Sequence, residues 1–157
     1  GSGIATMLTL ARVYLDGSHP PTLRFIAFGA EEIGLFGSRH YVSSLSADER
    51  DDIVAMLNFD VLGSGETIEV LGDPALVEEI LDYGEAQSIE VRRGVSVPGA
   101  SSDHASFAAV GVPTVFFLAD DLSRINSSAD NIEFVQPKLM GIAAILGVGL
   151  VDSLTDR

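Results

Sequence analysis

Two adjacent glutamates, Glu31 and Glu32, directly follow a short apolar run near the start of the sequence. Neighbouring residues on an extended backbone point to opposite sides, so one carboxylate could hold a metal ion while the other faces a reacting water. A second interpretation is structural. The pair precedes a helical pattern, and acidic side chains are favoured at a helix N-terminus by the helix dipole. The residues by themselves leave both interpretations open.

Three later apolar runs are also followed by polar side chains. Asp60 lies in the run LNFDV, and a carboxylate buried there needs a cation, a backbone N–H or an arginine to offset its desolvation. Asp103 and His104 open a helical pattern, in which Asp103 suits an N-cap and a neutral His104 suits either a ligand role or a passive one. Segment 126–131, which contains Asp130, is rich in Asn, Asp and Ser and is typical of a turn.

Short apolar runs alternate with helical patterns along the chain, and this order positions the polar residues. Strands are predicted at residues 23–28, 53–61, 67–71, 88–91 and 113–118, with 23–28 buried and 53–61 central. Helices are predicted at residues 4–15, 34–45, 75–86, 102–110 and 137–154, with a turn at 16–21. Because the strands are almost continuously apolar, both faces of the sheet should be covered. The predicted fold class is therefore α/β, a three-layer sandwich with a largely parallel or mixed central sheet and helices on both faces.

In such sheets ligands bind beyond the carboxyl ends of the strands, which is where these polar residues lie. The sequence has no phosphate-binding loop, no G-x-S-x-G motif and no H-E-x-x-H motif. Carboxylates that converge at one sheet edge favour a metal site over nucleophilic catalysis.

Composition narrows the function classes further. The 157 residues suit one domain, 1–157, and 9 basic against 23 acidic side chains give a formal net charge of −14. So few cations argue against binding to nucleic acid and to an anionic membrane surface. The absence of cysteine removes disulfides and thiolate ligands. The most apolar stretch, residues 139–151, is shorter than the ~20 residues that span a bilayer and is predicted as a buried helix rather than a membrane insertion.

The run RFIAFGAEEIGLFGS, residues 24–38, resembles the double-zinc aminopeptidase family, peptidase family M28, which also includes glutamate carboxypeptidases and glutaminyl cyclases. Further landmarks occur in the family's order through essentially the whole chain. They are Gly1-Ser2-Gly3, Leu57-Asn58-Phe59-Asp60, Ser102-Asp103-His104 with Phe107, and Gly111-Val112-Pro113. The resemblance implies the phosphorylase/hydrolase-like, zinc-peptidase type of sandwich, a peptide substrate and two zinc ions.

The resemblance also assigns roles residue by residue. Glu31 matches the general base that takes a proton from the metal-bridging water. Glu32 matches a ligand of one zinc and Asp60 a ligand of the other. Asp103, His104 and Asp130 match positions that lie against the substrate or behind the metal ligands.

The sequence departs from the family pattern at three positions. The family's first histidine ligand, in an H-x-D motif, and the aspartate that bridges both zincs lie upstream of the segment that corresponds to Gly1-Ser2-Gly3. The last histidine ligand corresponds to Asn126, whose neutral amide is a poor ligand for zinc. The expectation is a single truncated peptidase-like domain that does not hold two zincs and hydrolyses peptides poorly or not at all.

Two alternatives remain open from the sequence. One is a non-catalytic peptidase-like module that binds a peptide or protein, which Asn126 favours. The other is a glutaminyl-cyclase-like transferase. A truncated sheet would expose an edge, so we also expect self-association through that edge. Relatives of this family are often exported, and the sequence assigns no compartment.

Overall fold

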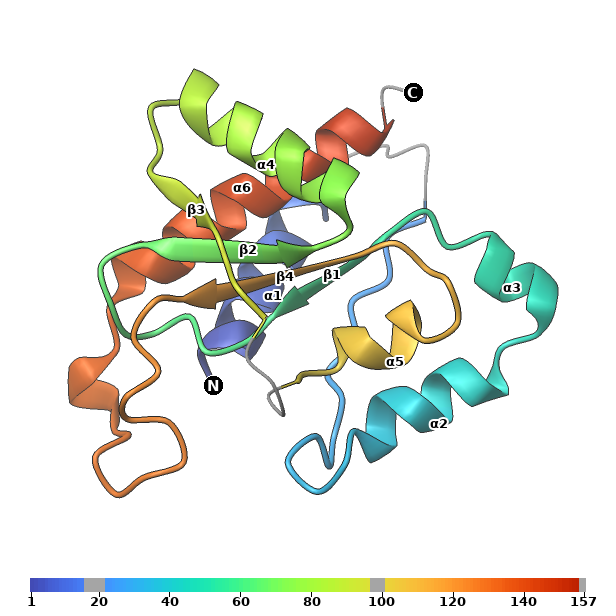
Figure 1. Cartoon of the computed structure of the whole chain (residues 1–157), viewed down its shortest axis with the longest axis horizontal. Helices are drawn as coiled ribbons and strands as arrows, with labels where there is room; N and C mark the ends of the chain where they lie inside the picture. Colours follow the sequence, from blue (N-terminus) through green and yellow to red (C-terminus); the bar gives the residue numbers. More distant parts are fainter. Residues whose placement is uncertain (16–21, 97–100, 156–157) are drawn as a thin grey trace.

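The computed structural model describes residues 1–15, 22–96 and 101–155 (Figure 1). The turn predicted at 16–21 lies outside the described residues. The elements in chain order are α1 (Ser2–Val13), α2 (Phe36–Ser44), α3 (Ala47–Asp51), β1 (Met56–Phe59), β2 (Ile68–Gly72), α4 (Pro74–Ala86), β3 (Val91–Arg93), α5 (His104–Ala108), β4 (Thr114–Ala119), the short 3₁₀ helix η1 (Ile132–Phe134) and α6 (Pro137–Thr155).

Four strands form one mixed sheet in the order β1-β4-β2-β3. β1 runs parallel to β4, and β2 runs parallel to β3 and antiparallel to β4. Helices α1, α4 and α6 pack on one face, while α5 packs on the other face with α2 outside it (Figure 1). The predicted α/β sandwich, with a mixed sheet covered on both faces, is therefore confirmed.

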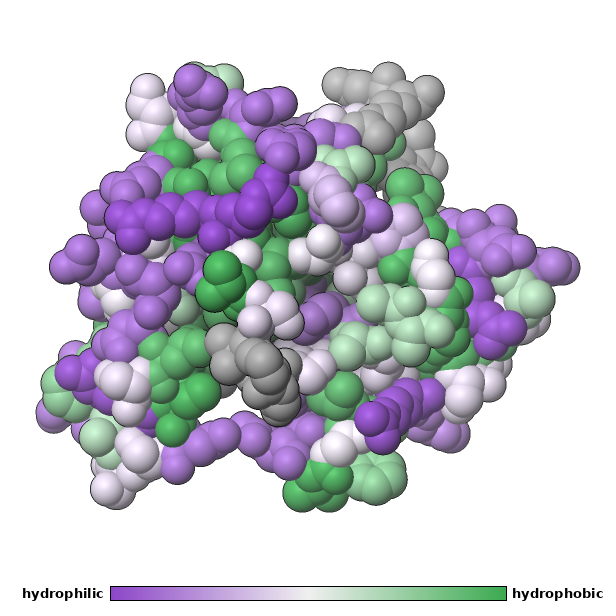
Figure 2. Space-filling model, viewed as in Figure 1, coloured by the Kyte–Doolittle hydropathy of each residue, from purple (hydrophilic) through white to green (hydrophobic). Residues whose placement is uncertain are grey.

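The main core lies between the sheet and helices α4 and α6, and a smaller cluster lies between α2 and α5. The main cluster consists of Leu62, Ile68, Val70, Leu76, Val77, Ile80, Val115, Phe117, Ala119, Leu139, Ala143, Leu146 and Leu150. The smaller cluster consists of Val42, Phe107 and Val112. Each large apolar side chain that is fully buried contributes about 1.5–3 kcal/mol to stability. On the face shown in Figure 2, hydrophobic side chains come to the surface in separate groups among hydrophilic ones.

Helix α6 is long and apolar enough to cross a membrane by length and composition alone. Its side chains Leu139, Leu146 and Leu150 are nevertheless buried in the main core, and the helix packs on α1, α4 and β2. This is the packing of a core helix, as predicted for residues 139–151.

Two predictions about the sheet are wrong. Residues 23–28 belong to no strand, and Phe25 is 40% exposed rather than buried. β1 covers only residues 56–59 and lies at the edge of the sheet, not in its centre. A central strand needs a hydrogen-bonding neighbour on each side, and the described residues supply one for β1 on the β4 side only. Self-association through an exposed edge of the sheet stays a prediction.

Smaller differences have local causes. The helix predicted from residue 34 begins at Phe36, because Gly34 and Leu35 adopt left-handed backbone conformations with φ of 123° and 58°. The strand predicted at 88–91 is displaced to β3, since Ser88 has a φ of 56° and cannot continue a ladder. Helix α3 was not predicted, although Ser46 and Glu49 form a capping box at its start.

Candidate active site

Glu31 and Glu32 lie in the loop that leads into α2, not in the helix. The loop turns sharply at Ala30, whose φ is 60°, and the Glu31 carbonyl accepts hydrogen bonds from the N–H groups of Gly34 and Leu35 at 3.0 and 2.9 Å. The first turn of α2 contains no acidic residue. The interpretation of the pair as a helix N-terminus is therefore wrong. Glu31 is half-buried and Glu32 is exposed.

Asp60 follows β1 directly and both of its carboxylate oxygens accept hydrogen bonds. Oδ1 accepts the Val61 N–H at 2.9 Å, and Oδ2 accepts the Ser102 hydroxyl at 3.0 Å. The Asn58 side chain donates to the same hydroxyl at 2.9 Å. Because a serine hydroxyl has only one proton, the Asn58 amide forces that proton toward Asp60. The sequence left a cation, a backbone N–H or an arginine as possible partners of Asp60. The structure shows the backbone N–H of Val61, and the hydroxyl of Ser102 in place of an arginine.

Asp103 and His104 lie at the start of α5. Asp103 occupies the N-cap position but makes no side-chain cap, and at 8% exposure its Oδ1 has no hydrogen-bond partner among the described residues. The capping interpretation of Asp103 is therefore wrong. His104 stacks on Phe116 with the ring centroids 4.8 Å apart, and its Nδ1 is likewise unpartnered in the described part of the chain. Burial lowers the pKa of His104, against an opposing effect of Asp60, so the imidazole is neutral near pH 7.

Asn126 reaches Glu32 across the molecule. Its Nδ2 donates to Glu32 Oε2 at 3.1 Å, which joins two loops that are 94 residues apart in the sequence. Asp130, in the same loop as Asn126, is exposed. Its backbone N–H donates to the carbonyl of Ser127 at 3.1 Å, while no hydrogen bond or ion pair between described residues ties its carboxylate to the other acids.

Four of the sequence-predicted acids influence one another electrostatically. The pKa of Glu31 is raised, first by partial burial and then by the negative charges of Asp60, Glu32 and Asp103. Burial likewise raises the pKa of Asp103, with a further contribution from Asp60 and an opposing hydrogen bond from Ser38. The loop before α2, the end of β1 and the start of α5 therefore bring these carboxylates to one end of the sheet, as the topology predicted.

Among the described residues, no third metal-binding side chain joins the predicted ligands Glu32 and Asp60. Within residues 1–15, 22–96 and 101–155, no group of three or more His, Asp or Glu side chains is placed to hold a metal ion. Catalytic zinc normally has three protein ligands. Glu32 and Asp60 supply two carboxylates, and the bonds from Asn126, Ser102 and Val61 already use some of their oxygen lone pairs.

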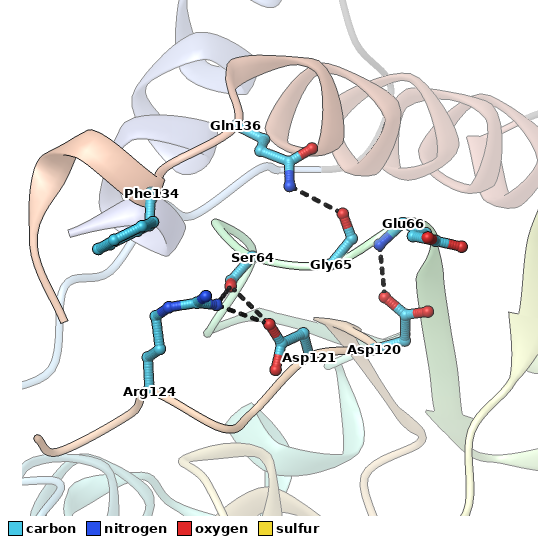
Figure 3. A pocket seen from close by; sticks show the side chains of 8 residues that line it. All are labelled: Ser64, Gly65, Glu66, Asp120, Asp121, Arg124, Phe134 and Gln136. Carbon is cyan, nitrogen blue, oxygen red and sulfur yellow. Dashed lines mark hydrogen bonds and ion pairs between the residues drawn. The ribbon is translucent and has the colours of Figure 1, made fainter. Parts of the chain in front are cut away.

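A cavity of about 450 Å³ lies beside the Asn126 loop (Figure 3). Arg124 Nη1 donates to Asp121 Oδ2 at 2.9 Å, and its guanidinium carbon lies 4.5 Å from the centre of the Phe134 ring. Gln136 Nε2 donates to the Gly65 carbonyl at 2.9 Å. These lining residues were not predicted, and the only sequence signal for them is the opposite charges of Asp121 and Arg124 three positions apart.

Asp121→Asn should destabilise the protein near pH 7, and this destabilisation should become smaller as the pH falls to about 3. Hydrogen bonds from Ser123, with help from Ser64 and Arg124, lower the pKa of Asp121 to about 2. A pKa lower in the folded than in the unfolded chain stabilises the fold above the unfolded value of 3.8, and this contribution is lost between 3.8 and about 2. Urea unfolding midpoints of both proteins, measured between about pH 7 and pH 3, test this. A gap that does not narrow with acid would contradict it.

A sequence model described as peptidase family M28 matches residues 1–147. The chain belongs to peptidase family M28. Among curated relatives, leucine aminopeptidase 1 of Phaeosphaeria nodorum is 32% identical over 157 residues, which cover 86% of this chain and 40% of that protein. Aminopeptidase YwaD of Bacillus subtilis is 32% identical over 127 residues, 77% of this chain and 28% of that protein.

Solved structures of zinc aminopeptidases and related enzymes have the same fold as this chain. A zinc aminopeptidase from Bacillus subtilis superposes with a TM-score of 0.85 at 28% identity, covering 97% of this chain and 40% of that chain. LapA aminopeptidase from Legionella pneumophila gives 0.86 at 25% identity, covering 99% and 46%. This M28 chain thus spans less than half the length of the relatives it matches. A glutaminyl cyclase at 19% identity, with a TM-score of 0.63, shares the fold alone.

Proposed function

We propose that this chain carries part of the catalytic site of an aminopeptidase, with Glu31 as the general base and with Asp60 and Glu32 at the two positions that correspond to one carboxylate ligand for each zinc of the family. The observation that supports this is the mutual influence of Glu31, Glu32, Asp60 and Asp103 at the carboxyl end of β1 in an M28 fold. Such a concentration of negative charge opposes folding unless a proton or a cation offsets it, which is a cost typical of functional sites.

Zinc is the metal that we propose, because solved neighbours of this chain are zinc aminopeptidases. Glu32 and Asp60 are fewer than the three protein ligands that catalytic zinc normally has, so we propose that the 157 residues by themselves bind zinc weakly and hydrolyse peptides poorly.

Glu31 suits the proton-transfer part of peptide hydrolysis. As a base it would accept one proton from the attacking water while the water oxygen bonds to the scissile carbonyl carbon. It would then return that proton to the nitrogen as the C–N bond breaks, which releases the free amine of the shortened peptide. A raised pKa makes its carboxylate a stronger base than an ordinary exposed glutamate. Asp103 and Asp60 would attract the substrate's charged N-terminal amine through their negative charges.

Glu31→Gln should lower any hydrolysis of a leucyl anilide by the 157-residue chain about 100-fold to 10,000-fold, the usual contribution of a general base. The assay is run with added zinc. Glu66→Gln, a change to an exposed acid outside the cluster, is the matched control and should leave the rate unchanged. Equal rates for the Glu31 variant and the unmodified chain would remove Glu31 from the mechanism.

Glu31→Gln should also stabilise the folded protein near neutral pH. Glu31 binds its proton more tightly in the folded state, so its contribution to stability falls as pH rises through its raised pKa. Removing the charge should therefore raise the thermal midpoint near pH 8, and this gain should disappear near pH 4, where the glutamate is protonated. A loss of stability at both values would contradict the placement of Glu31 among repelling carboxylates.

The hydrogen bond from Asn126 to Glu32 supports a second candidate, a peptidase-like module that binds peptides without cleaving them. This candidate predicts peptide binding that survives Glu31→Gln and no hydrolysis in either protein. The absence of zinc-stimulated hydrolysis in the unmodified chain would favour it over the enzyme.

A further inference from the structure

Asn126 contacts Glu32 through its side-chain amide and occupies one of the carboxylate oxygens. The amide Nδ2–H of Asn126 points at Glu32 Oε2, at a distance of 3.1 Å. The nitrogen of a side-chain amide donates hydrogen bonds, and its oxygen can bind a metal ion. Only one of these two atoms can face Glu32 at a time. With the nitrogen toward Glu32, the pair is satisfied as a hydrogen bond. With the oxygen toward Glu32, two oxygen atoms would repel each other unless a cation lay between them.

The loop that carries Asn126 is anchored, which keeps this side chain beside Glu32. Arg124 is held between the Asp121 carboxylate and the Phe134 ring, and Ser64 donates to the same carboxylate at 3.2 Å (Figure 3). The Ser127 hydroxyl donates to the Arg124 carbonyl at 2.7 Å. Two residues beyond this anchor, Asn126 adopts a left-handed backbone with φ of 56°, a conformation that asparagine tolerates better than most residues.

We propose that Asn126 closes the Glu32 side of the site with a hydrogen bond in place of a metal ion. This proposal rests on the proposed function and narrows it, because the position of Glu32 is then filled by the Asn126 amide and only the position of Asp60 remains for a metal ion. If so, the chain binds at most one divalent cation, next to Asp60. Asn126 is then the residue that prevents a second cation from binding at Glu32. Three observations support it: the donor orientation of the amide, the anchored loop, and the absence of a three-ligand group in the described residues. A neutral amide is also a weak ligand for zinc.

Asn126→His tests the proposal without changing the backbone requirement, since histidine is also enriched in the left-handed conformation. An imidazole supplies the nitrogen lone pair that zinc prefers. Asn131→His is the matched control, because it adds the same imidazole to the same loop. The Asn131 side chain accepts the Glu133 N–H at 3.0 Å and is not bonded to Glu32.

The experiment is zinc calorimetry on the 157-residue chain, the two histidine variants, Glu32→Gln, and the double variant of Asn126→His with Glu32→Gln. Asn126→His should bind zinc about tenfold or more tightly than both the unmodified chain and Asn131→His, and adding Glu32→Gln should abolish the gain. Glu32→Gln in the unmodified chain should leave zinc affinity unchanged.

Two results would overturn the proposal. One is a loss of about tenfold or more in zinc affinity when Glu32→Gln is made in the unmodified chain, because Glu32 would then already be a ligand. The other is an Asn126→His variant that binds zinc no more tightly than Asn131→His. The first comparison changes only an exposed side chain, so it decides the question even if the histidine variant folds poorly. Neither depends on hydrolysis, so failure here is distinguishable from failure of the proposed enzyme.

Discussion

Gly3→Ala should destabilise the fold by about 3 kcal/mol, at the upper end of what an overpacked core costs. Helix α1 approaches β1 so closely that a Cβ on Gly3 would overlap the carbonyl oxygen and carbon of Phe59. These are backbone atoms and cannot move aside as the end of a flexible side chain would. The helix would have to withdraw, which would also strain the hydrogen bond from the Leu62 N–H to Ser2 Oγ at 3.0 Å.

The matched control is the same substitution at Gly141 in α6, where, apart from the adjacent residues and the helix's own nearby backbone, no atom of the described residues lies within 4 Å of the added Cβ. Alanine there should stabilise the protein by about 0.5–1 kcal/mol, because a helical glycine loses more backbone entropy on folding. Urea unfolding gives both values. Opposite signs are expected, and a Gly3→Ala protein as stable as the unmodified chain would show that α1 is not in close contact with β1.

The packing at Gly3 also matters for the site, because Phe59 directly precedes Asp60. A withdrawn α1 would release the end of β1, so the hydrogen bonds that Asp60 accepts from Val61 and Ser102 should weaken. We therefore expect Gly3→Ala to reduce any zinc binding that depends on Asp60. Stability and the position of this carboxylate are thus controlled by the same contact.

Phe117→Ala should destabilise the fold by about 3–5 kcal/mol, the usual cost of emptying a large buried aromatic site. Phe117 is fully buried in the middle of β4, and its ring stacks on that of Phe59 with centroids 4.7 Å apart. The substitution removes both the buried area and this stacking. The rigid sheet cannot collapse to fill the space that remains.

Phe25→Ala removes the same ring from a residue that is 40% exposed and outside the sheet, so it should cost much less. The difference between the two variants, measured by denaturant or thermal unfolding, isolates the effect of burial from that of residue type. Similar losses at both positions would mean that residues 23–28 are held in the core more firmly than their exposure indicates.

Local sequence features predicted much of this molecule correctly. The helices at 75–86 and 137–154 were predicted within one residue of their observed ends, because Asp73-Pro74 and Pro137 mark their starts and apolar residues recur on their buried faces. The motifs around Glu31, Asp60 and Asp103 identified the family, and the comparisons confirm it. All of these signals are carried by residues close together in the chain.

The tertiary structure decided what depends on distant contacts. The hydrophobicity of residues 23–28 predicts a strand, but none of the described strands pairs with this segment. The apolar run of β1 likewise does not reveal that β1 lies at the edge of the sheet. The bond between Asn126 and Glu32 joins positions 94 residues apart, and the buried Oδ1 of Asp103 has no hydrogen-bond partner within the part of the chain that the structure describes. The sequence by itself determined which chemical groups this protein has and which elements carry them, since propensity and motif spacing act locally. Only the tertiary structure decided which of those groups face each other, because strand pairing, burial and hydrogen-bond partners are set by segments that meet when the chain folds.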